Sequence, residues 1–380
     1  MPVISVYVNT FIAMLLLMLL FVLLSGKNRG LASHVPLFLL GIILYYSLFL
    51  YESVMSSGLV IGIWGAFLSL LPIVVGYTLV DQKMIKEVAK VMYVVIIIYT
   101  ITSITTYIGL GLFPNASRMM AFGTIEDNAI YYRYNIGGYG FIYSLVILHP
   151  MIVAFLRKKT NLLICIAFSF IAGMVIVKAD YTIAILLFLL SCFSYLMPLD
   201  NEKNVKLKTR MLIVFALIVF LNIGSLLDFL AVQTFLGESS LKIADVSRIL
   251  QGSQFTELDM TIREELYRDS WETFIESHCL GSVFINTATK VGGHSMIIDF
   301  LGNWGILGGI SIILVYMFYI KLFKRIAGAN RIVWFSYLSL FISILVSLLN
   351  TGFGTYELGL LVPIALLYPT YDNMQSNHGG

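Results

Sequence analysis

Residues 161–177 have the sequence NLLICIAFSFIAGMVIV, and residues 181–197 follow almost at once with YTIAILLFLLSCFSYLM. Neither stretch contains a charged residue or a histidine. A helix that crosses the hydrocarbon core of a bilayer needs about 20 mainly apolar residues, with a lower limit of roughly 17. The two stretches therefore predict neighbouring membrane-spanning helices joined by a short turn.

The composition of the whole chain extends this interpretation. Of its 380 residues, 59% are hydrophobic and only 12% are charged, whereas soluble domains carry about 25% charged residues. This balance excludes an ordinary cytosolic enzyme, a disordered chain and a nucleic-acid-binding protein, despite the formal net charge of +3. The three cysteines, Cys165, Cys192 and Cys279, have no metal-ligand spacing, so zinc and redox chemistry are also excluded.

Apolar runs of spanning length recur along the chain, and we count about eleven. They cover residues 3–25, 35–51, 58–80, 88–112, 138–156, 161–177, 181–197, 211–236, 296–320, 332–349 and 354–370. The first run lacks a basic start and a small-residue cleavage site, so we expect a retained span and not a signal peptide. The sequence thus predicts an all-α polytopic membrane protein, with residues 1–380 forming a single integral membrane domain.

Basic residues orient this domain. Alternate loops hold 16 of the 24 Lys and Arg residues, and loops rich in these residues stay in the cytoplasm. We therefore expect an outside N-terminus, a cytoplasmic C-terminus and two long external loops, at 113–137 and 237–293.

The larger external loop contains a predicted helix. Thr261 and Glu264 match a capping box, with Thr at the N-cap and Glu three residues later. Apolar residues then recur at helical spacing, at Ile262, Leu266, Tyr267, Trp271, Phe274 and Ile275. The pattern predicts an amphipathic helix of about five turns, which lies along the outer membrane surface or packs on the bundle of spans. This helix carries Arg263 and Arg268, and the plainest interpretation of both is a solvated surface charge paired with a neighbouring acidic residue. For Arg268 we favour that interpretation.

A histidine stands at the outer mouth of the ninth predicted span. His294 follows Gly292 and Gly293, and glycines permit a close backbone approach. A lone interfacial histidine is as often merely solvated as functional, so both interpretations stay open. Five residues later, Asp299 is expected to make a structural hydrogen bond, with orientation of the imidazole as the alternative. Lys178 and Asp180, at the outer end of another span, are expected to pair with each other.

The smaller external loop, 113–137, carries two arginines, Arg118 and Arg133, among aromatic residues that include Tyr132. Tyrosines beside arginines are typical of a membrane-interface belt with snorkelling side chains. They are also suited to binding sugars and phosphates, so both interpretations remain.

The spacing of five residues resembles that of a known family. Arg263, Gly281 eighteen residues later, His294, and Gly305 and Gly308 resemble the C-terminal signature of bacterial O-antigen ligases and Wzy-type repeat-unit polymerases. Two positions depart from the family pattern: Ser295 stands where Asn is commoner, and Cys279 occupies the position of a glycine found in some polymerases.

This resemblance implies a GT-C-like membrane glycosyltransferase that polymerises polyprenyl-diphosphate-linked oligosaccharide repeat units into capsule, exopolysaccharide or O-antigen. It would act at the outer face of the bacterial plasma membrane. It implies His294 as the catalytic base and Arg263 as a diphosphate ligand, since guanidinium groups bind such oxygens in a bidentate manner. Arg118 and Arg133 are further diphosphate candidates, with Arg118 ranked slightly ahead, and Arg268, Asp299 and Tyr132 are secondary site candidates.

No cofactor or metal is expected, because no paired carboxylates at Mg²⁺-binding spacing stand out. The expected partners are the lipid-linked oligosaccharide, membrane lipid, a flippase and a chain-length regulator, with no nucleic acid. A ligase that moves finished glycan to a lipid or protein acceptor is the main alternative. A secondary transporter is the other, and the lack of an internal repeat argues against it.

Overall fold

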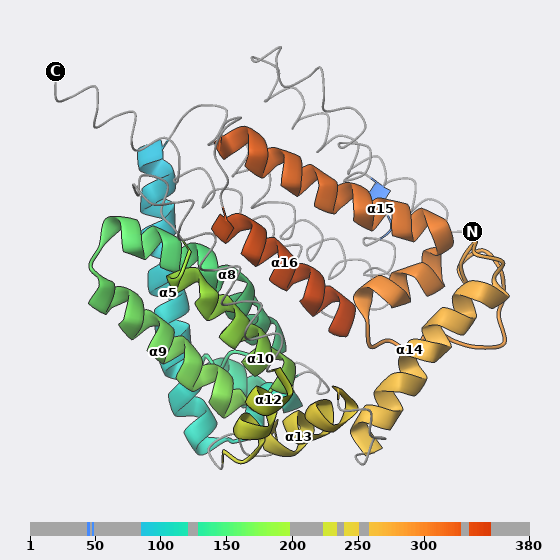
Figure 1. The fold of residues 1–380 in the computed structure, drawn as a ribbon, viewed down its shortest axis with the longest axis horizontal. Helices are drawn as coiled ribbons and strands as arrows, with labels where there is room; N and C mark the ends of the chain where they lie inside the picture. The colour runs from blue at the N-terminus through green and yellow to red at the C-terminus, as the bar shows by residue number, and fades with distance from the viewer. Residues whose placement is uncertain are drawn as a thin grey trace. The chain divides into compact units, whose positions relative to one another are not determined.

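The computed structural model of the chain describes residues 44, 45, 48, 85–120, 128–197, 223–233, 239–250, 258–327 and 334–350. Every regular element in these ranges is helical and none is a strand, which confirms the all-α prediction (Figure 1). The chain divides into two compact units, each assembled from segments distant in sequence. One comprises 1–89, 266–332 and 347–380, and the other comprises 90–265 and 333–346.

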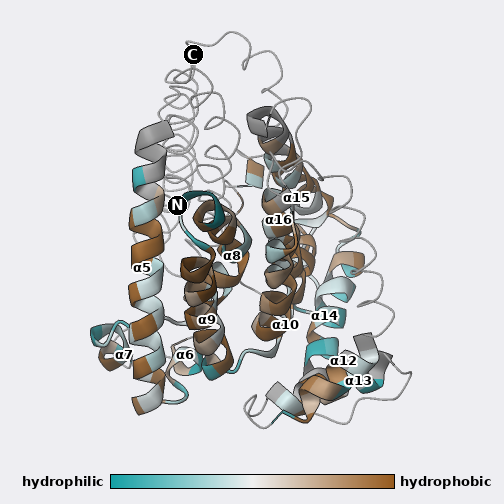
Figure 2. Ribbon diagram, turned by 60° about the vertical axis from the view of Figure 1, so that its left-hand side comes forward, coloured by the Kyte–Doolittle hydropathy of each residue, from teal (hydrophilic) through white to brown (hydrophobic). Residues whose placement is uncertain are grey.

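The unit that contains residues 90–265 is built around one buried helix. This helix, α8 (Tyr139–Lys159), packs against α9 (Leu162–Ala179) and α10 (Thr182–Ser191), and a 3₁₀ turn, η1 (Cys192–Tyr195), extends α10. Every side chain of α8 from Ile142 to Leu156 is buried. A helix that is apolar on all sides is expected to be surrounded by others, and Figure 2 shows the hydrophobic colouring along all three helices.

Helix α5 (Ile85–Leu112) has one buried and one exposed apolar face. Its exposed residues recur every three or four positions, at Val94, Ile97, Ile101, Ile104, Ile108 and Leu112. The opposite face is buried and includes Met92, Ile96, Tyr99, Ser103 and Thr106. A continuous exposed apolar stripe on a helix of spanning length is the surface expected to face lipid.

Four helices in the described ranges are long and apolar enough to cross a membrane: Met92–Leu112, Tyr139–Lys159, Leu162–Ala179 and Met296–Met317. Two shorter apolar helices, Thr182–Tyr195 and Phe335–Leu349, coincide with two more of the predicted spans. The chain is therefore a helical membrane protein. The predicted spans 3–25, 35–51, 58–80 and 354–370 lie wholly or mostly outside the described residues, as does the first half of 211–236.

The two loops that the sequence predicts to be external, 113–137 and 237–293, contain helices of their own. Short helices α6 (Ala116–Met119) and α7 (Ala129–Arg133) occupy the loop 113–137. Later in the chain, α12 (Ile223–Ala231) packs against α13 (Ser239–Leu250), where the Ser247 hydroxyl donates a 2.5 Å hydrogen bond to Asp228.

The helix predicted in the loop 237–293 is α14 (Leu258–Glu276), with 19 residues, but two residues of its expected apolar face, Trp271 and Ile275, are exposed while Ser270 is buried. It begins three residues before Thr261, so the prediction that Thr261 is its N-cap was wrong.

The last two described helices are α15 (Met296–Ala327) and α16 (Trp334–Leu349). The sequence predicted one continuous span at 296–320, but α15 is interrupted at Gly305, whose φ of 60° and ψ of −146° are not helical. This break positions the candidate site.

Candidate functional site

The residues around the break in α15 contact the loop that follows α14. The carbonyls of Gly302 and Asn303 accept hydrogen bonds from the backbone amides of Ser282 and Val283, at 2.9 and 3.1 Å. On the other side of the break, the amide of Ile306 donates to the carbonyl of Cys279 at 2.9 Å. Because unsatisfied backbone groups are costly inside a membrane, this loop supplies the partners that the interrupted helix lacks.

Glycines make this contact possible. Gly281 has a φ of 98°, and a Cβ atom there would clash with the backbone of Asn303 to Gly305. A Cβ atom on Gly305 would in turn clash with the backbone of Cys279 and Leu280. These two positions carry part of the resemblance to the ligases and polymerases, and only glycine fits at either of them.

The loop returns to α14 before it enters α15. Gly292 lies against the backbone of Leu266, and a Cβ atom on Gly302 would come within 2.9 Å of the carbonyl oxygen of Ser270. Glu276, the last residue of α14, accepts two hydrogen bonds from Thr289 in the loop, at 3.0 Å from the amide and 2.8 Å from the hydroxyl. These bonds lower the pKa of the exposed Glu276 carboxyl, because they stabilise its charged form.

Asp299 holds the last residues of the loop. Its carboxylate accepts hydrogen bonds from the Ser270 hydroxyl at 2.6 Å, the Ser295 amide at 2.9 Å and the Gly293 amide at 3.3 Å. The buried Ser270 hydroxyl also accepts a 2.9 Å hydrogen bond from the amide of Gly292. The expected structural hydrogen bond of Asp299 is confirmed, and the amides that it binds flank His294.

Ser295 is the N-cap of α15. Its hydroxyl accepts a hydrogen bond from the amide of Ile298 at 3.3 Å, while its own amide donates to Asp299. Serine and asparagine are both strong N-cap residues. The departure from the family pattern at this position therefore replaces one good cap with another.

The ring of His294 is half-buried, and Gly293 beside it is exposed. Nδ1 lies 3.0 Å from the carbonyl oxygen of Gly293. A carbonyl can only accept, so the hydrogen bond requires the proton on Nδ1. In the neutral ring, Nε2 then keeps its lone pair and can accept a proton.

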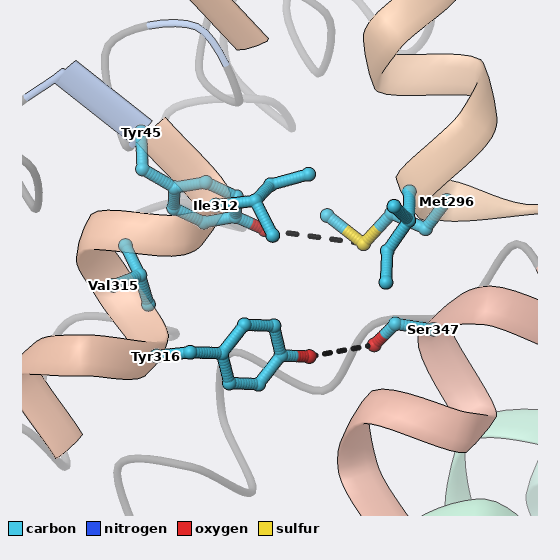
Figure 3. Close-up of a pocket in the computed structure, with 7 residues that line it drawn as sticks. Tyr45, Met296, Ile312, Val315, Tyr316 and Ser347 are labelled. Atoms are coloured by element: carbon cyan, nitrogen blue, oxygen red, sulfur yellow. Dashed lines mark hydrogen bonds between the residues drawn. The ribbon is translucent and has the colours of Figure 1, made fainter. Parts of the chain in front are cut away.

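The first residues of α15, which follow His294 in the chain, contact the end of α16 and line an apolar pocket. The amide of Met296 donates to the carbonyl of Asn350, and the hydroxyl of Tyr267 donates to that of Leu349, both at 2.9 Å. The pocket is shown in Figure 3, where Tyr45 points to the sulfur of Met296 at 3.9 Å and Tyr316 to Ser347 at 3.2 Å. Its lining also includes Ile297, Ile312 and Val315.

The arginines of α14 differ in their surroundings. Arg268 is exposed and lies 3.8 Å from Glu272 one turn later, as the solvated-charge interpretation predicts. Arg263 is half-buried and belongs to the compact unit 90–265, whereas His294 belongs to the other. The joint action of Arg263 and His294 stays a prediction.

The arginines of the loop 113–137 also differ from each other. Arg118 donates to the backbone carbonyl of Asp180, lies 3.5 Å from its carboxylate and lies 5.7 Å from the Tyr181 ring centroid. Arg133 is exposed, as is Tyr132, and among the described residues it has no ion-pair partner. The guanidinium of Arg133 is thus the more accessible of the two.

The predicted pair of Lys178 and Asp180 was wrong. Asp180 binds Arg118, while the Lys178 ammonium lies over the ring of Tyr107, 4.2 Å from its centroid. Asp180 ends α9 in the left-handed conformation, so its side chain leaves the helix direction that Lys178 follows. Sequence proximity therefore does not make these two residues partners.

Two polar residues were not singled out from the sequence. Ser270 is a small hydroxyl on a helix rich in charged residues, and its role depends on the fold. His149 lies in the middle of the apolar run of α8, and an ionisable residue inside a span is a recognisable signal. Across the part of the chain that the structure describes, no three His, Cys, Asp or Glu side chains gather as a metal site.

No protein-family model and no curated protein matches this chain. Assignment to a function therefore depends on the residues of the site.

Proposed function

We propose that the chain is a membrane glycosyltransferase that polymerises polyprenyl-diphosphate-linked oligosaccharide repeat units at the outer face of the bacterial plasma membrane. One observation carries the proposal. The hydrogen bond of Nδ1 to the Gly293 carbonyl leaves the Nε2 lone pair of His294 available, and the Asp299 carboxylate holds the loop by binding the amides of Gly293 and Ser295. Gly281 and Gly305, from the same signature, fit the loop against α15.

The chemistry needs a proton acceptor and a site for the leaving group. The hydroxyl oxygen of the acceptor glycan attacks the anomeric carbon of the donor sugar. The bond from that carbon to the diphosphate breaks, and the diphosphate leaves with the bonding electrons. The hydroxyl proton passes to Nε2 of His294, a general-base contribution of typically about 10²–10⁴-fold.

Arginine is suited to the diphosphate because its planar fork binds two oxygens at once. Arg263 is the first candidate by its place in the signature. Arg133 is the better second ligand, since Arg118 already binds Asp180 and would have to exchange that partner. Asp299 acts through the loop and is a positioning residue.

A deletion strain tests this function. If the protein is a polymerase, single lipid-linked repeat units accumulate and long polymer disappears. Accumulation of finished polymer on the carrier lipid would instead show a ligase that transfers to another acceptor. A normal profile of lipid-linked glycans would contradict both.

A further inference from the structure

A second polar cluster lies within α8, α9, α10 and η1, far along the chain from the residues considered above. His149 is fully buried in the middle of α8, with the rings of Phe168 and Phe188 at centroid distances of 6.2 and 4.9 Å. Both α8 and α9 have the length and composition of membrane spans. Ionisable side chains inside spans are costly and are usually functional.

Both ring nitrogens of His149 make short contacts. Nδ1 lies 2.8 Å from the hydroxyl of Ser191, which donates to the carbonyl of Phe188 at 2.6 Å. Nε2 lies 2.7 Å from the hydroxyl of Ser169. Because the Ser191 proton is used on a carbonyl, the contact at Nδ1 requires a proton from the ring.

The chain of contacts continues from Ser169. Its oxygen lies 2.7 Å from the hydroxyl of Tyr195, which donates to the carbonyl of Cys165 at 2.7 Å. The cluster thus consists of five contacts between polar atoms, with a backbone carbonyl at each end.

Each of these contacts needs one proton, and carbonyls provide none. The three hydroxyl groups provide three protons, and a neutral imidazole provides a fourth. One contact of 2.6–2.8 Å therefore has no proton while His149 is neutral. With both ring nitrogens protonated, Nε2 donates to Ser169, Ser169 to Tyr195 and Tyr195 to Cys165, and every contact is a hydrogen bond.

Burial opposes this second proton. The described helices α8, α9, α10 and η1 contain no Asp or Glu that could balance an imidazolium charge. The titratable and charged side chains on the elements that pack around His149 are Tyr195, Cys165 and Cys192, with Lys178 at the far end of α9 and Arg157, Lys158, Lys159, Tyr139 and Tyr143 on α8. Arg157 donates to the carbonyls of Ser194 and Met197 at the end of η1. Burial thus favours the neutral ring of His149, whereas the contact that lacks a proton in the neutral state favours the doubly protonated ring.

We propose that this cluster is a proton-binding site, separate from the candidate glycosyl-transfer residues, in which Nε2 of His149 takes up one proton without loss of any contact. Acidification then converts an incomplete chain of contacts into a complete one and tightens the packing of α8 against α9 and α10. No covalent bond forms or breaks apart from the N–H bond.

The proton count can be changed by one substitution. Tyr195→Phe removes two contacts and one proton, so three contacts and three protons remain with a neutral ring. Tyr99→Phe is the matched control, since Tyr99 is a buried tyrosine that donates to Ser144 at 3.0 Å, outside the cluster.

The measurement is ¹⁵N solid-state NMR of the full chain, labelled at histidine and reconstituted in lipid bilayers, between pH 8 and pH 4.5. His149→Gln identifies the resonances of His149. We expect the wild type and Tyr99→Phe to show a doubly protonated ring at the acid end, and Tyr195→Phe to bind this proton about tenfold more weakly, the effect of one hydrogen bond. A wild-type ring that stays neutral at pH 4.5, or equal titration of Tyr195→Phe and wild type, would overturn the proposal.

Discussion

The hydroxyl of Ser270 on α14 donates a 2.6 Å hydrogen bond to the carboxylate of Asp299 on α15. The same carboxylate binds the amides of Gly293 and Ser295, on both sides of His294. One side chain thereby fixes the junction between a helix, a loop and the first turn of the next helix. In our account, catalysis at His294 depends on this junction.

Asp299→Asn should therefore impair polymer formation even though His294 is unchanged. The amide keeps one acceptor oxygen but places an N–H group opposite the N–H groups of the loop, which disrupts a charge-assisted hydrogen bond at a loss of about 1.5–3 kcal/mol. The measurements are polymer length in cells and melting temperature of the purified protein. Glu272→Gln on α14 is the control, because its exposed pair with Arg268 contributes no more than about 1 kcal/mol. Equal behaviour of both variants would remove Asp299 from its positioning role.

The break in α15 should tolerate no side chain. Gly305→Ala puts Cβ against the backbone of Cys279 in a left-handed conformation, for which we expect a loss of about 1–3 kcal/mol in stability. Gly140→Ala at the start of α8 meets no atom within 4 Å and should leave stability unchanged or slightly raised. Thermal melting in detergent compares the two. A stable Gly305→Ala protein would mean that the loop does not contact α15 in this way.

Acid should release one end of the loop. The two bonds from Thr289 lower the pKa of Glu276, so their stabilising effect is present above the ordinary carboxyl pKa and is lost as pH falls through the lower folded value. The protection of the amides of residues 285–292 against hydrogen exchange, relative to the intrinsic rate at each pH, should then fall below about pH 4.5, the ordinary value. Glu276→Gln, whose amide does not titrate in this range, should remove that pH dependence. Persistence of the same acid transition in the glutamine variant would assign it to another group.

Arg263→Lys tests the diphosphate ligand. An ammonium keeps the charge but cannot bind two oxygens in one plane, so we expect most of the polymerising activity to be lost. Arg268→Lys on the same helix is the control and should remain active, since Arg268 contacts Glu272 on the exposed face. The measurement is polymer length in cells with matched protein levels. Normal polymer from the Arg263→Lys variant would exclude this residue from the site.

An external location of the loop 237–293 can be tested with cysteine probes. Lys242→Cys on α13 should react with a membrane-impermeant thiol reagent in intact cells. Lys90→Cys, at the expected cytoplasmic end of α5, should react only after lysis. The opposite pattern would reverse the orientation that the basic residues predict.

The sequence predicted the spans well where composition alone determines them. The uncharged runs 138–156 and 161–177 correspond to Tyr139–Lys159 and Leu162–Ala179, because apolar length decides such helices. The break at Gly305 was not predictable in this way. Its glycines fit a continuous helix equally well, and the break depends on a loop more than twenty residues earlier in the chain.

The candidate site shows the same division. The place of Asp299, beside His294 at the start of a helix, allowed a structural hydrogen bond to be expected. Its donor Ser270 could not be identified, because that contact joins residues 29 positions apart. The predicted pairing of Asp180 with Lys178 was wrong for the same reason, because closeness in sequence does not ensure contact. The fold brings Arg118 to Asp180 and Tyr107 to Lys178.

The assignment of His294 as the general base is tested most directly by polymerisation of purified lipid-linked repeat units by the His294→Gln variant. Glutamine keeps a hydrogen-bonding side chain but cannot take the proton of the acceptor hydroxyl. We predict no polymer from His294→Gln, with protein level and binding of the lipid-linked repeat close to those of the wild type. Substantial polymer from His294→Gln would contradict the assignment of His294 as the base and leave it only a binding role.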